Sequence, residues 1–503
     1  MSRFPVESEL CDSVTGAGRP EHNCAEIVRR RVVEHGWSDR VALRTPAGEW
    51  THGQVHDLAG RAATVLSGLG VRAGDRLLLA LPDCAAWPVA FLAGARLGAL
   101  VVCVNPGLSA DEHRHVLDVV DPVVVIADEP IAGVHVLGGD DLCERARGAE
   151  VAPVAPVRPE DPLYAQFTSG TTGAPKGIVH THADPGRYYE LVGVPVVEPR
   201  PEDVTFSASK LYFAYGFGNA FVFPLWSGSS VVLMREKPTP RAVADLVATH
   251  GVTLLYAVPS LYAGLVAERP EAFVSVRAAV SAGEALPPAV AERTADLLGF
   301  LPLDQLGSTE AGHGICSNTI HDNRPGTIGR ALPGYELRVV AENGEPVADG
   351  GEGRLWVRGP TLFQSFLDGA SGAPGRNWWA TGDLVVRRPD GALTHRGRID
   401  DLEMVGGITV APAEIERLLG GHRGVSAVVV TAVRDERGAS KLWAFVVPAP
   451  EAGPLDQLSA DLLALARRSL APFKVPRGVR FVADLPRTAT GKTRRFLVRE
   501  GRW

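Results

Sequence analysis

The chain has 503 residues, 45% of them hydrophobic, and a formal net charge of −7. A chain of this length is too long for a single hydrophobic core, so we expect at least two domains. The acidic balance, without a basic stripe, gives no reason to expect a nucleic-acid partner.

The N-terminal and the most apolar segments argue against a membrane or secreted protein. Residues 85–105 are the most apolar stretch but include Pro88 and Arg96, whereas a membrane span needs roughly 20 clean apolar residues. Residues 1–10 carry acidic side chains where a signal peptide requires an apolar run. The six cysteines are scattered and form no CxxC pair, which indicates neither a zinc site nor a disulfide framework. We therefore expect a cytoplasmic protein with no membrane partner.

Strands and helices alternate from about residue 40. Continuous apolar strands separated by helices predict a parallel sheet that is covered on both faces. The predicted strands are residues 75–81, 100–104, 123–128, 252–257 and 277–281. The predicted helices are residues 85–97, 241–250 and 260–267, and one that begins near Ser109 with acidic residues in its first turn.

The pattern changes after about residue 325, where dense turn signals between short alternating strands predict antiparallel β structure. A small α+β module follows residue 398, with helices at 412–419 and 458–470 and strands at 427–433 and 442–447. The sequence thus predicts an α/β fold in two parts. Residues 1–399 form a large N-terminal domain of parallel α/β sheets plus a β-rich subdomain, and residues 400–503 form a small α+β C-terminal domain.

The segment from Thr168 to Gly177, TSGTTGAPKG, carries the clearest chemical signal. Its glycines let the backbone turn tightly, successive amide N–H groups in such a loop form an anion-binding concavity, and Lys176 adds a positive charge. A flexible Ser/Thr/Gly linker is the alternative, but the defined ending at residues 175–177 favours a polyphosphate loop. The loop is not of the Walker A type, because Pro175 stands where that motif requires glycine.

Two further segments place oxygen ligands near strand ends. Residues 304–310 (DQLGSTE) follow an apolar strand end at residues 300–303, where ligands bind in open α/β sheets. The Thr hydroxyl and Glu carboxylate in this segment suit a phosphate oxygen and Mg²⁺. Residues 379–383 (WATGD) are predicted to place Asp383 after a tight turn, where its carboxylate suits ribose hydroxyls.

Two more segments lie toward the C-terminus. Residues 397–401 (GRIDD) fall at the change of pattern and are a candidate hinge. Residues 488–493 (TATGKT) present Lys492 on a glycine-bearing loop, which is not a Walker loop either, because Pro486 occupies its first glycine position. Lysine is scarce in this chain, so a lysine within a motif indicates a function rather than an ordinary solvent-exposed residue.

The order and spacing of these five segments resemble the adenylate-forming superfamily of acyl- and aryl-CoA synthetases, carrier-protein-loading adenylation domains and luciferases. The resemblance covers roughly residues 30–500, and five motifs in order argue against chance. Within the superfamily, residues 207–219 (SASKLYFAYGFGN), followed by Phe223-Pro224, look like the benzoate-CoA ligase subgroup.

The resemblance implies a two-step reaction. A carboxylate attacks the α-phosphate of Mg·ATP to give acyl-AMP and pyrophosphate, and a thiol, usually that of coenzyme A, then displaces AMP to give a thioester. The N-terminal domain would hold ATP and the acid, and the C-terminal domain would be mobile and rotate between the two steps. The implied cofactors are ATP, Mg²⁺ and coenzyme A, the last as a co-substrate.

The resemblance also implies a role for each matching position. The residues that would bind ATP or AMP are Thr168, Ser169, Gly170, Thr171, Thr172, Gly173, Lys176, Gly283, Glu284, Asp304, Leu306, Thr309, Asp383, Arg398 and Lys492. The residues that would bind the acid are Phe213, Ala214, Tyr215, Ser281, Ala282, Gly283, Gln305, Gly307 and His313. Lys492, Glu310 and Thr309 would be catalytic, with Glu310 as metal ligand, Asp400 as hinge, and Gly406, Gly407 and Phe473 as the coenzyme A contacts.

Two positions depart from the family pattern. Leu306 stands where the family usually has an aromatic residue that stacks on adenine, and Gln305 stands where the benzoate subgroup has glycine. Gln305 and His313 bring polar groups to a pocket that is otherwise aromatic. We therefore expect a benzoate with a hydroxy or amino substituent as the substrate.

Other interpretations are weaker or stay open. His180 and His182 form an HxH pair, but no third ligand is evident, so a local structural role is favoured over a metal site. The four functional groups at Lys176, Glu310, Asp383 and Lys492 disfavour a degenerate acyl-AMP-binding protein, and the failed Walker spacings disfavour a P-loop NTPase. A carrier-protein phosphopantetheine is the alternative to coenzyme A as acceptor. The exact substituent, the pathway and the choice between monomer and homodimer are not fixed by the sequence.

Overall fold

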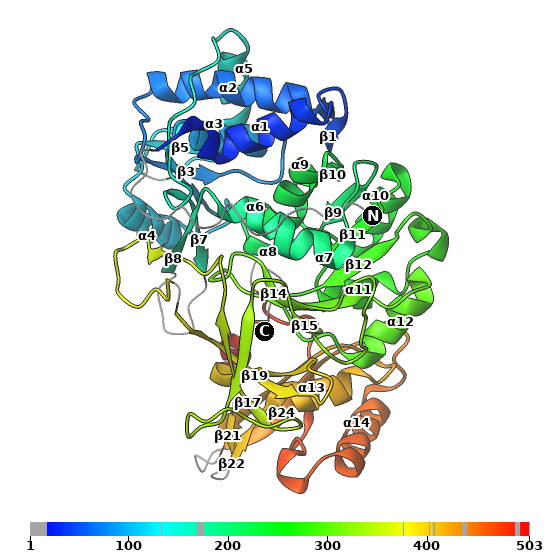
Figure 1. The fold of residues 1–503 in the computed structure, drawn as a ribbon. Coiled ribbons are helices and arrows are strands. Elements are labelled where there is room, and N and C mark those ends of the chain that lie inside the picture. The colour runs from blue at the N-terminus through cyan, green and yellow to red at the C-terminus, as the bar shows by residue number, and fades with distance from the viewer. Residues whose placement is uncertain are drawn as a thin grey trace.

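The computed structural model describes residues 18–131, 133–168, 176–375, 377–401, 403–405, 408–434, 440–487 and 493–501. Figure 1 shows a large N-terminal body, coloured blue to yellow, above a smaller orange and red C-terminal domain. The body contains three sheets of seven, nine and four strands. This arrangement confirms the predicted α/β fold with a large N-terminal and a small C-terminal domain.

The seven-stranded sheet has the strand order β18-β8-β7-β4-β3-β5-β6. Its strands are β3 (Arg76–Ala80), β4 (Leu100–Cys103), β5 (Val124–Ala127), β6 (Val136–Leu137), β7 (Pro162–Thr168), β8 (Lys176–Thr181) and β18 (Ser365–Phe366). Neighbours from β6 across to β7 pair in parallel, and β8 is antiparallel to β7. The strands predicted at 75–81, 100–104 and 123–128 are confirmed.

The nine-stranded sheet has the order β15-β14-β13-β12-β11-β9-β10-β1-β2. Its strands are β1 (Val41–Thr45), β2 (Gly48–Thr51), β9 (Val204–Ser207), β10 (Ser230–Val232), β11 (Leu254–Ala257), β12 (Ala278–Ser281), β13 (Leu303–Gly307), β14 (Gly314–Ser317) and β15 (Arg330–Ala331). The central strands are parallel, so the carboxyl ends of β9, β11, β12 and β13 meet at one edge. Ligands bind at such an edge in open α/β sheets.

The helices of the body close its core from both sides. They are α1 (Cys24–Glu34), α2 (His52–Gly68), α3 (Ala86–Arg96), α4 (Ala110–Val120), α5 (Gly139–Arg147), α6 (Asp184–Tyr188), η2 (Tyr189–Gly193), α7 (Val194–Val197), α8 (Ala214–Gly216), η3 (Phe217–Val222), α9 (Phe223–Ser227), α10 (Pro240–His250), α11 (Pro259–Leu265) and α12 (Pro288–Leu298). Helix α4 begins as predicted, because the Ser109 side chain accepts from the Glu112 amide while Glu112 returns the contact in a capping box.

A cluster of buried aromatic rings joins the two large sheets. Trp87 and Phe91 on α3 lie 5.5 and 4.9 Å from the ring of Phe221, measured between centroids. Phe217 on η3 lies 4.5 Å from Tyr164 on β7 by the same measure. The aromatic side chains of the π-helical segment η3 thus pack into this core. This packing fixes the place of the residues that precede η3, which form α8.

A four-stranded antiparallel sheet follows, with the order β16-β17-β19-β20. Its strands are β16 (Glu336–Val340), β17 (Glu352–Arg358), β19 (Trp379–Arg387) and β20 (Leu393–Arg398). The antiparallel structure predicted after residue 325 is therefore confirmed. The tight turn predicted before Asp383 is wrong: this residue lies within β19, where strand pairing continues on both sides of Gly382.

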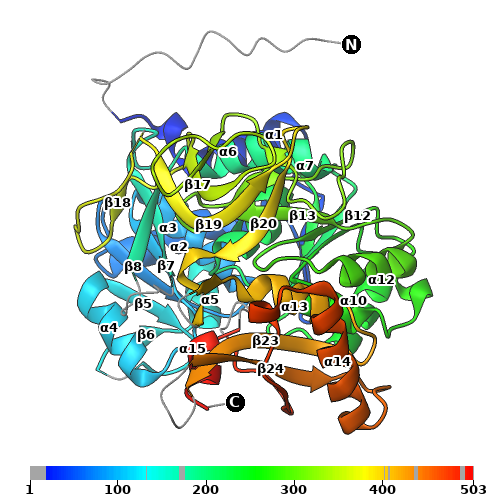
Figure 2. The same cartoon turned by 90° about the horizontal axis from the view of Figure 1, so that it is seen from below.

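The C-terminal domain packs helices on a three-stranded sheet. Its elements are η5 (Ile399–Asp401), the hairpin β21 (Glu403–Val405) and β22 (Ile408–Val410), α13 (Pro412–Gly420), β23 (Val425–Arg434), β24 (Ser440–Pro448), α14 (Leu455–Ser469), η6 (Pro472–Lys474), β25 (Val479–Phe481) and α15 (Arg495–Arg499). Figure 2 shows α13 between this sheet and β20 of the N-terminal body. Among the described residues, no helix has both the length and the apolar character needed to cross a membrane.

Candidate active site

The carboxyl edge of the nine-stranded sheet collects several of the predicted site residues. Ser281 ends β12 and pairs across the sheet with Asp304 on β13. The Ser281 hydroxyl and the Oδ1 atom of Asp304 are buried and have no hydrogen-bond partner among the described residues. Burial raises the pKa of Asp304 well above its usual range. Such atoms are open to a ligand that supplies the missing hydrogen bond.

The segment 304–307 does not follow a strand end, as predicted, but is itself part of strand β13. Because side chains alternate along a strand, Asp304 and Leu306 share one face while Gln305 points to the other. Gln305 is buried, and its Nε2 atom donates to Ser317 Oγ on β14 over 3.2 Å. One strand therefore serves two regions, one beside Asp304 and one beside Gln305.

A pocket opens beside Asp304 at the junction of the two domains. Its walls are Ala285, Leu286, Pro288, Asp304, Gly326, Thr327, Ile328, His395 and Arg417. A mixed lining of apolar side chains with the Asp304 carboxylate, His395 and Arg417 suits a flat heterocycle that presents an amino group. Leu306, the residue expected beside adenine, is partly buried against the main core and is not among the residues that line this pocket.

Asp383 is held in a fixed, charged arrangement. Its Oδ1 atom lies 3.0 Å from His395 Nε2, and its Oδ2 atom lies 3.5 Å from Arg398 Nη1. Burial raises the pKa of Asp383, but the hydrogen bond and charge of His395, with the charge of Arg398, outweigh burial and bring it below the usual range. Gly382 has φ +78°, and a Cβ there would lie 2.7 Å from the Arg398 guanidinium, so only glycine allows this approach.

Thr309 and Glu310 lie in the turn between β13 and β14, and backbone groups fix this turn. The Phe363 amide donates to the Glu310 carbonyl oxygen over 2.9 Å, and the Gly312 amide donates to that of Thr309 over 3.0 Å. Gly312 has φ +70°, and a Cβ at this position would lie 1.8 Å from the Tyr188 hydroxyl. Contacts on both sides therefore fix the backbone of the turn. The side chains of Thr309 and Glu310 are only partly buried.

His180 connects this turn to β8. Its Nε2 atom lies 2.8 Å from the Thr309 carbonyl oxygen, and its Nδ1 atom lies 3.1 Å from the Tyr188 hydroxyl, which is in turn 2.9 Å from that of Tyr164. A carbonyl only accepts, so Nε2 carries a proton, while Nδ1 faces both the Tyr188 hydroxyl and Asp184 Oδ2, the latter at 3.6 Å. His182 has a separate partner, because its Nδ1 atom accepts from the Cys24 amide over 3.1 Å. The two histidines therefore make different local contacts, as the favoured interpretation of the HxH pair requires.

The predicted phosphate loop joins two antiparallel strands. Thr168 ends β7 and Lys176 begins β8, and these two residues face each other across the pair. Ser169, Gly170, Thr171, Thr172 and Gly173 lie outside the described residues. The Lys176 ammonium lies 5.3 Å from the centroid of the Phe366 ring, at the surface of the sheet edge.

His313, one of the predicted acid-binding residues, lies beside a second one, Tyr215, and beside Phe223 and Asn219. Its ring lies 5.9 Å from Tyr215 and 5.0 Å from Phe223 between centroids, and its Nε2 atom lies 3.1 Å from Asn219 Oδ1. Burial lowers the pKa of His313 to about 3, so it is neutral near pH 7. The Nδ1 atom of His313 and the Nδ2 atom of Asn219 have no hydrogen-bond partner among the described residues. Sequence reasoning missed Asn219, although it ends the segment that resembles the benzoate-CoA ligases.

Other predicted acid-site positions lie nearby in the chain. Phe213 precedes α8, Ala214 begins it, and the Tyr215 hydroxyl donates to the Val280 carbonyl oxygen over 3.0 Å. Ala282 and Gly283 follow directly after β12, and Gly307 ends β13. These positions border an aromatic and polar region at the same sheet edge as Asp304.

The C-terminal domain reaches this edge through two arginines. Arg417 Nη2 donates to the His395 carbonyl oxygen over 2.7 Å, and Arg487 Nη1 lies 4.0 Å from Glu284 Oε1. Phe473, in contrast, lies on η6 and is 42% exposed. Lys492, Gly406 and Gly407 lie outside the described residues, and Asp400 lies in η5 directly after β20.

Comparisons with known proteins agree with this geometry. Residues 29–367 match the family described as AMP-binding enzyme, and residues 414–492 match the AMP-binding enzyme C-terminal domain. The chain therefore belongs to the AMP-binding enzyme family. This finding confirms the predicted resemblance to the adenylate-forming superfamily.

Named relatives place the chain near ligases for aromatic acids. It is 39% identical to a p-hydroxybenzoic acid–AMP ligase of Mycobacterium tuberculosis over 95% of this chain and 69% of the relative. It is 36% identical to the benzoate–CoA ligase of Thauera aromatica over 95% of this chain and 96% of the relative. The crystal structure of an anthranilate CoA ligase with anthranoyl-AMP matches with a TM-score of 0.90 and 32% identity, covering 95% of this chain and 97% of that one. The predicted enzyme class, acid–thiol ligases, and the likeness to benzoate-CoA ligases are confirmed.

Proposed function

We propose that this protein activates an aromatic carboxylic acid with ATP, giving aryl-AMP and pyrophosphate, and then transfers the aryl group to the thiol of coenzyme A. One observation carries the proposal. Strand β13 places Asp304 in the wall of the pocket, and the turn that follows it leads through Thr309 and Glu310 to His313, which lies among Tyr215 and Phe223. A nucleotide and an aryl acid can therefore meet at one strand end.

The nucleotide side uses two carboxylates in different states. Asp304 would accept the adenine amino proton in the pocket, and the ionised Asp383 would accept from the ribose hydroxyls, oriented by His395 and Arg398. Lys176 and the hydroxyl and amide groups of residues 168–173 would hold the β- and γ-phosphates. Positioning of this kind accounts for most of the catalysis when two anions must meet.

The oxygen donors present fit a magnesium ion. Glu310 offers a carboxylate and Thr309 a hydroxyl in a turn whose backbone is fixed by Phe363 and Gly312, and Mg²⁺ prefers oxygen ligands. When bound, Mg²⁺ would neutralise phosphate charge. Lys492 would bridge the attacking carboxylate and the α-phosphate, and Asp400 would be the point about which the C-terminal domain rotates for the thiol step.

The acid side favours a benzoate with a polar substituent. Tyr215, Phe223 and the His313 ring form an aromatic wall, and beside it Asn219 Nδ2 and His313 Nδ1 are buried polar atoms that make no well-formed hydrogen bond among the described residues, with Tyr215 as their polar neighbour. A hydroxyl or amino group on the ring can pair with them, and a fatty acid cannot. Relatives named for hydroxybenzoates and anthranilate support the same class.

A second acceptor is supported by one comparison. The relative from Mycobacterium tuberculosis is named as an AMP ligase, and the chain spans 69% of it. The second step would then load the phosphopantetheine thiol of a carrier protein instead of free coenzyme A. Both acceptors share the adenylation step.

The test is a pyrophosphate-release screen with benzoate, its hydroxy and amino isomers, cinnamate and a fatty acid. Each acid is assayed alone, with coenzyme A and with a phosphopantetheinylated carrier protein. Pyrophosphate release with substituted benzoates and a coenzyme A thioester product is expected. Release with fatty acids only, or with no acid at all, would overturn the proposal, and a thioester only on the carrier protein would change the acceptor.

A further inference from the structure

One side chain of the C-terminal domain lies in the wall of the pocket beside Asp304. Arg417 is on α13, and its Nη2 atom donates over 2.7 Å to the carbonyl oxygen of His395 on β20. The pocket is otherwise lined by N-terminal residues. Figure 2 shows α13 beside β20, so the pocket has this wall only while α13 occupies this place.

The charge of Arg417 acts on Asp304. Burial raises the pKa of Asp304, and the positive charge of Arg417 opposes that effect. The charged groups that act on Arg417 are Arg396, which disfavours its charge, and Asp304 and Glu414, which favour it. Burial lowers the pKa of Arg417, yet guanidinium stays charged at all ordinary pH values. Arg417 is thus a fixed cation that stabilises the ionised form of Asp304.

Arg417 also supports the second carboxylate indirectly. It holds the backbone of His395, and the Nε2 atom of the same histidine lies 3.0 Å from Asp383 Oδ1. The guanidinium therefore connects α13 both to the carboxylate in the pocket and to the residue that orients the other carboxylate.

We propose that Arg417 is a positioning residue that couples nucleotide binding to the position of the C-terminal domain, by completing the pocket and supporting Asp304 and His395 only in the arrangement seen here. The inference rests on the proposed function, because it takes this pocket as the adenosine site. By linkage, a domain position that favours the nucleotide is itself favoured by the nucleotide, to the same factor. Movement of α13 away from β20 would remove the wall and the cation together, and would thereby weaken the hold on AMP after the acid has been transferred.

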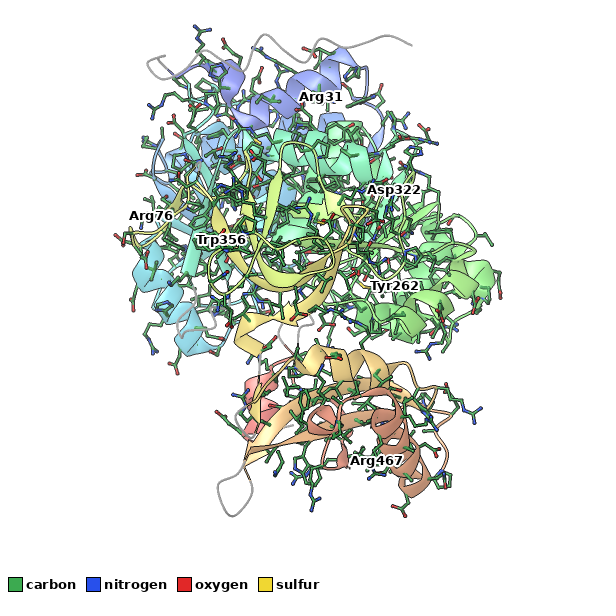
Figure 3. The ribbon with its side chains drawn as sticks, turned by 60° about the horizontal axis from the view of Figure 1, so that its bottom comes forward. Arg31, Arg76, Tyr262, Asp322, Trp356 and Arg467 are labelled. Atoms are coloured by element: carbon green, nitrogen blue, oxygen red, sulfur yellow. The ribbon has the colours of Figure 1, made fainter. Side chains whose placement is uncertain are left out.

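The test compares Arg417→Met, which keeps an apolar stem without charge, with Arg417→Lys, which keeps the charge. Arg467→Ala is the matched control, because Arg467 is an exposed arginine on α14 of the same domain, labelled in Figure 3. The dissociation constant of ATP is measured by calorimetric titration without acid. The KM for ATP and kcat are measured by pyrophosphate release, and thioester formation is measured from supplied aryl-AMP.

We expect Arg417→Met to raise the dissociation constant and the KM for ATP about ten-fold, within the range of ordinary coupling between sites. The kcat for pyrophosphate release should change much less, Arg417→Lys should recover part of the affinity, and Arg467→Ala should behave as the native protein. Unchanged ATP affinity in a folded Arg417→Met protein would overturn the inference. So would an equal loss in Arg417→Lys and Arg417→Met, because the charge would then be irrelevant.

A double substitution tests whether Arg417 acts through Asp304. If it does, Asp304→Asn with Arg417→Met should lose little more ATP affinity than the worse single variant, because the pair acts as one unit. Fully additive losses would show that Arg417 does not act on Asp304. The titrations need no aryl acid, so a protein that releases no pyrophosphate with any acid would overturn the proposed function while still deciding this inference.

Discussion

The Nε2 atom of His180 donates a hydrogen bond of 2.8 Å to the carbonyl oxygen of Thr309, across 129 residues of sequence. His180 lies on β8, four residues after Lys176, and Thr309 immediately precedes Glu310 in the turn after β13. The bond therefore sets the distance between the strand that leaves the phosphate loop and the turn that carries the proposed metal ligand. The Nδ1 atom of His180 faces the Tyr188 hydroxyl at 3.1 Å and Asp184 Oδ2 at 3.6 Å.

We predict that His180→Phe slows pyrophosphate release by roughly two- to ten-fold, because it removes one of the two hydrogen bonds that the Thr309 carbonyl accepts, at a cost of about 0.5–1.5 kcal/mol, and leaves only that from the Gly312 amide. His180→Gln keeps a donor for that carbonyl and should recover much of the rate. Thioester formation from supplied aryl-AMP should change little in either variant. Tyr164→Phe, which removes the far end of the chain of hydroxyls, is the control. Equal rates for the Phe and Gln variants would show that the hydrogen bond does not matter.

Lys492 gives a prediction on the half-reactions. Lys492→Ala should abolish most pyrophosphate release, because the carboxylate and the α-phosphate lose the cation that bridges them. Transfer from supplied aryl-AMP to coenzyme A should be affected much less, because the C-terminal domain is proposed to rotate about Asp400 before that step and to carry Lys492 away from the α-phosphate. Both steps are measured by single-turnover assays with the same enzyme stock. A similar loss in both would remove Lys492 from its proposed role.

The sequence predicted the regular elements well, because they follow from local pattern. Apolar runs marked β3, β4 and β5, and the acidic residues that follow Ser109 marked the start of α4. The sequence-based prediction is wrong at Asp383. The segment WATGD contains a glycine, which favours a turn, but the segment is part of strand β19.

The remaining site features depend on contacts between distant segments. Arg417 reaches His395 across the domain boundary, and His180 reaches Thr309 across 129 residues, and no local signal marks either residue. Asn219 stands in a segment that resembles the benzoate-CoA ligases, but its pairing with His313 depends on the packing of η3 against the turn after β13. Such residues become visible only when the fold brings their partners together.

Acid should destabilise the protein through four buried histidines. Burial is the main cause that lowers the pKa of His52 and His182 to about 4 and of His56 and His313 to about 3, from 6.5. The unfolded chain therefore takes up protons below pH 6.5 while the folded chain does not, so stability is full above 6.5 and falls as the pH drops toward 4. At pH 5 each histidine costs about 2 kcal/mol. Asp83, whose pKa burial raises to about 6, offsets part of this loss.

The free energy of unfolding in urea, measured at pH 7 and pH 5, checks this prediction. His56→Leu should reduce the difference between the two values by about 2 kcal/mol, because one titrating group is removed. His56 is buried, with Glu26, Arg29, His52 and Arg96 as its charged neighbours. The exposed His35 serves as control in His35→Asn. If the two variants had the same pH dependence, burial of His56 would not be the cause.

The ring substituent of the acid gives the last prediction. An unsubstituted benzoate leaves Asn219 Nδ2 and His313 Nδ1 without partners, at a cost of about 1–3 kcal/mol for each unpaired group. We therefore expect at least one hydroxy or amino isomer to exceed benzoate about ten-fold in kcat/KM. Asn219→Leu should move this ratio toward benzoate, because it removes the buried Nδ2 donor and the partner of His313. Gln305→Gly should move the ratio less, because Gln305 Nε2 already donates to Ser317 Oγ. A native enzyme that clearly prefers plain benzoate, or an Asn219→Leu enzyme with unchanged ratios, would show that these two side chains do not select the substituent.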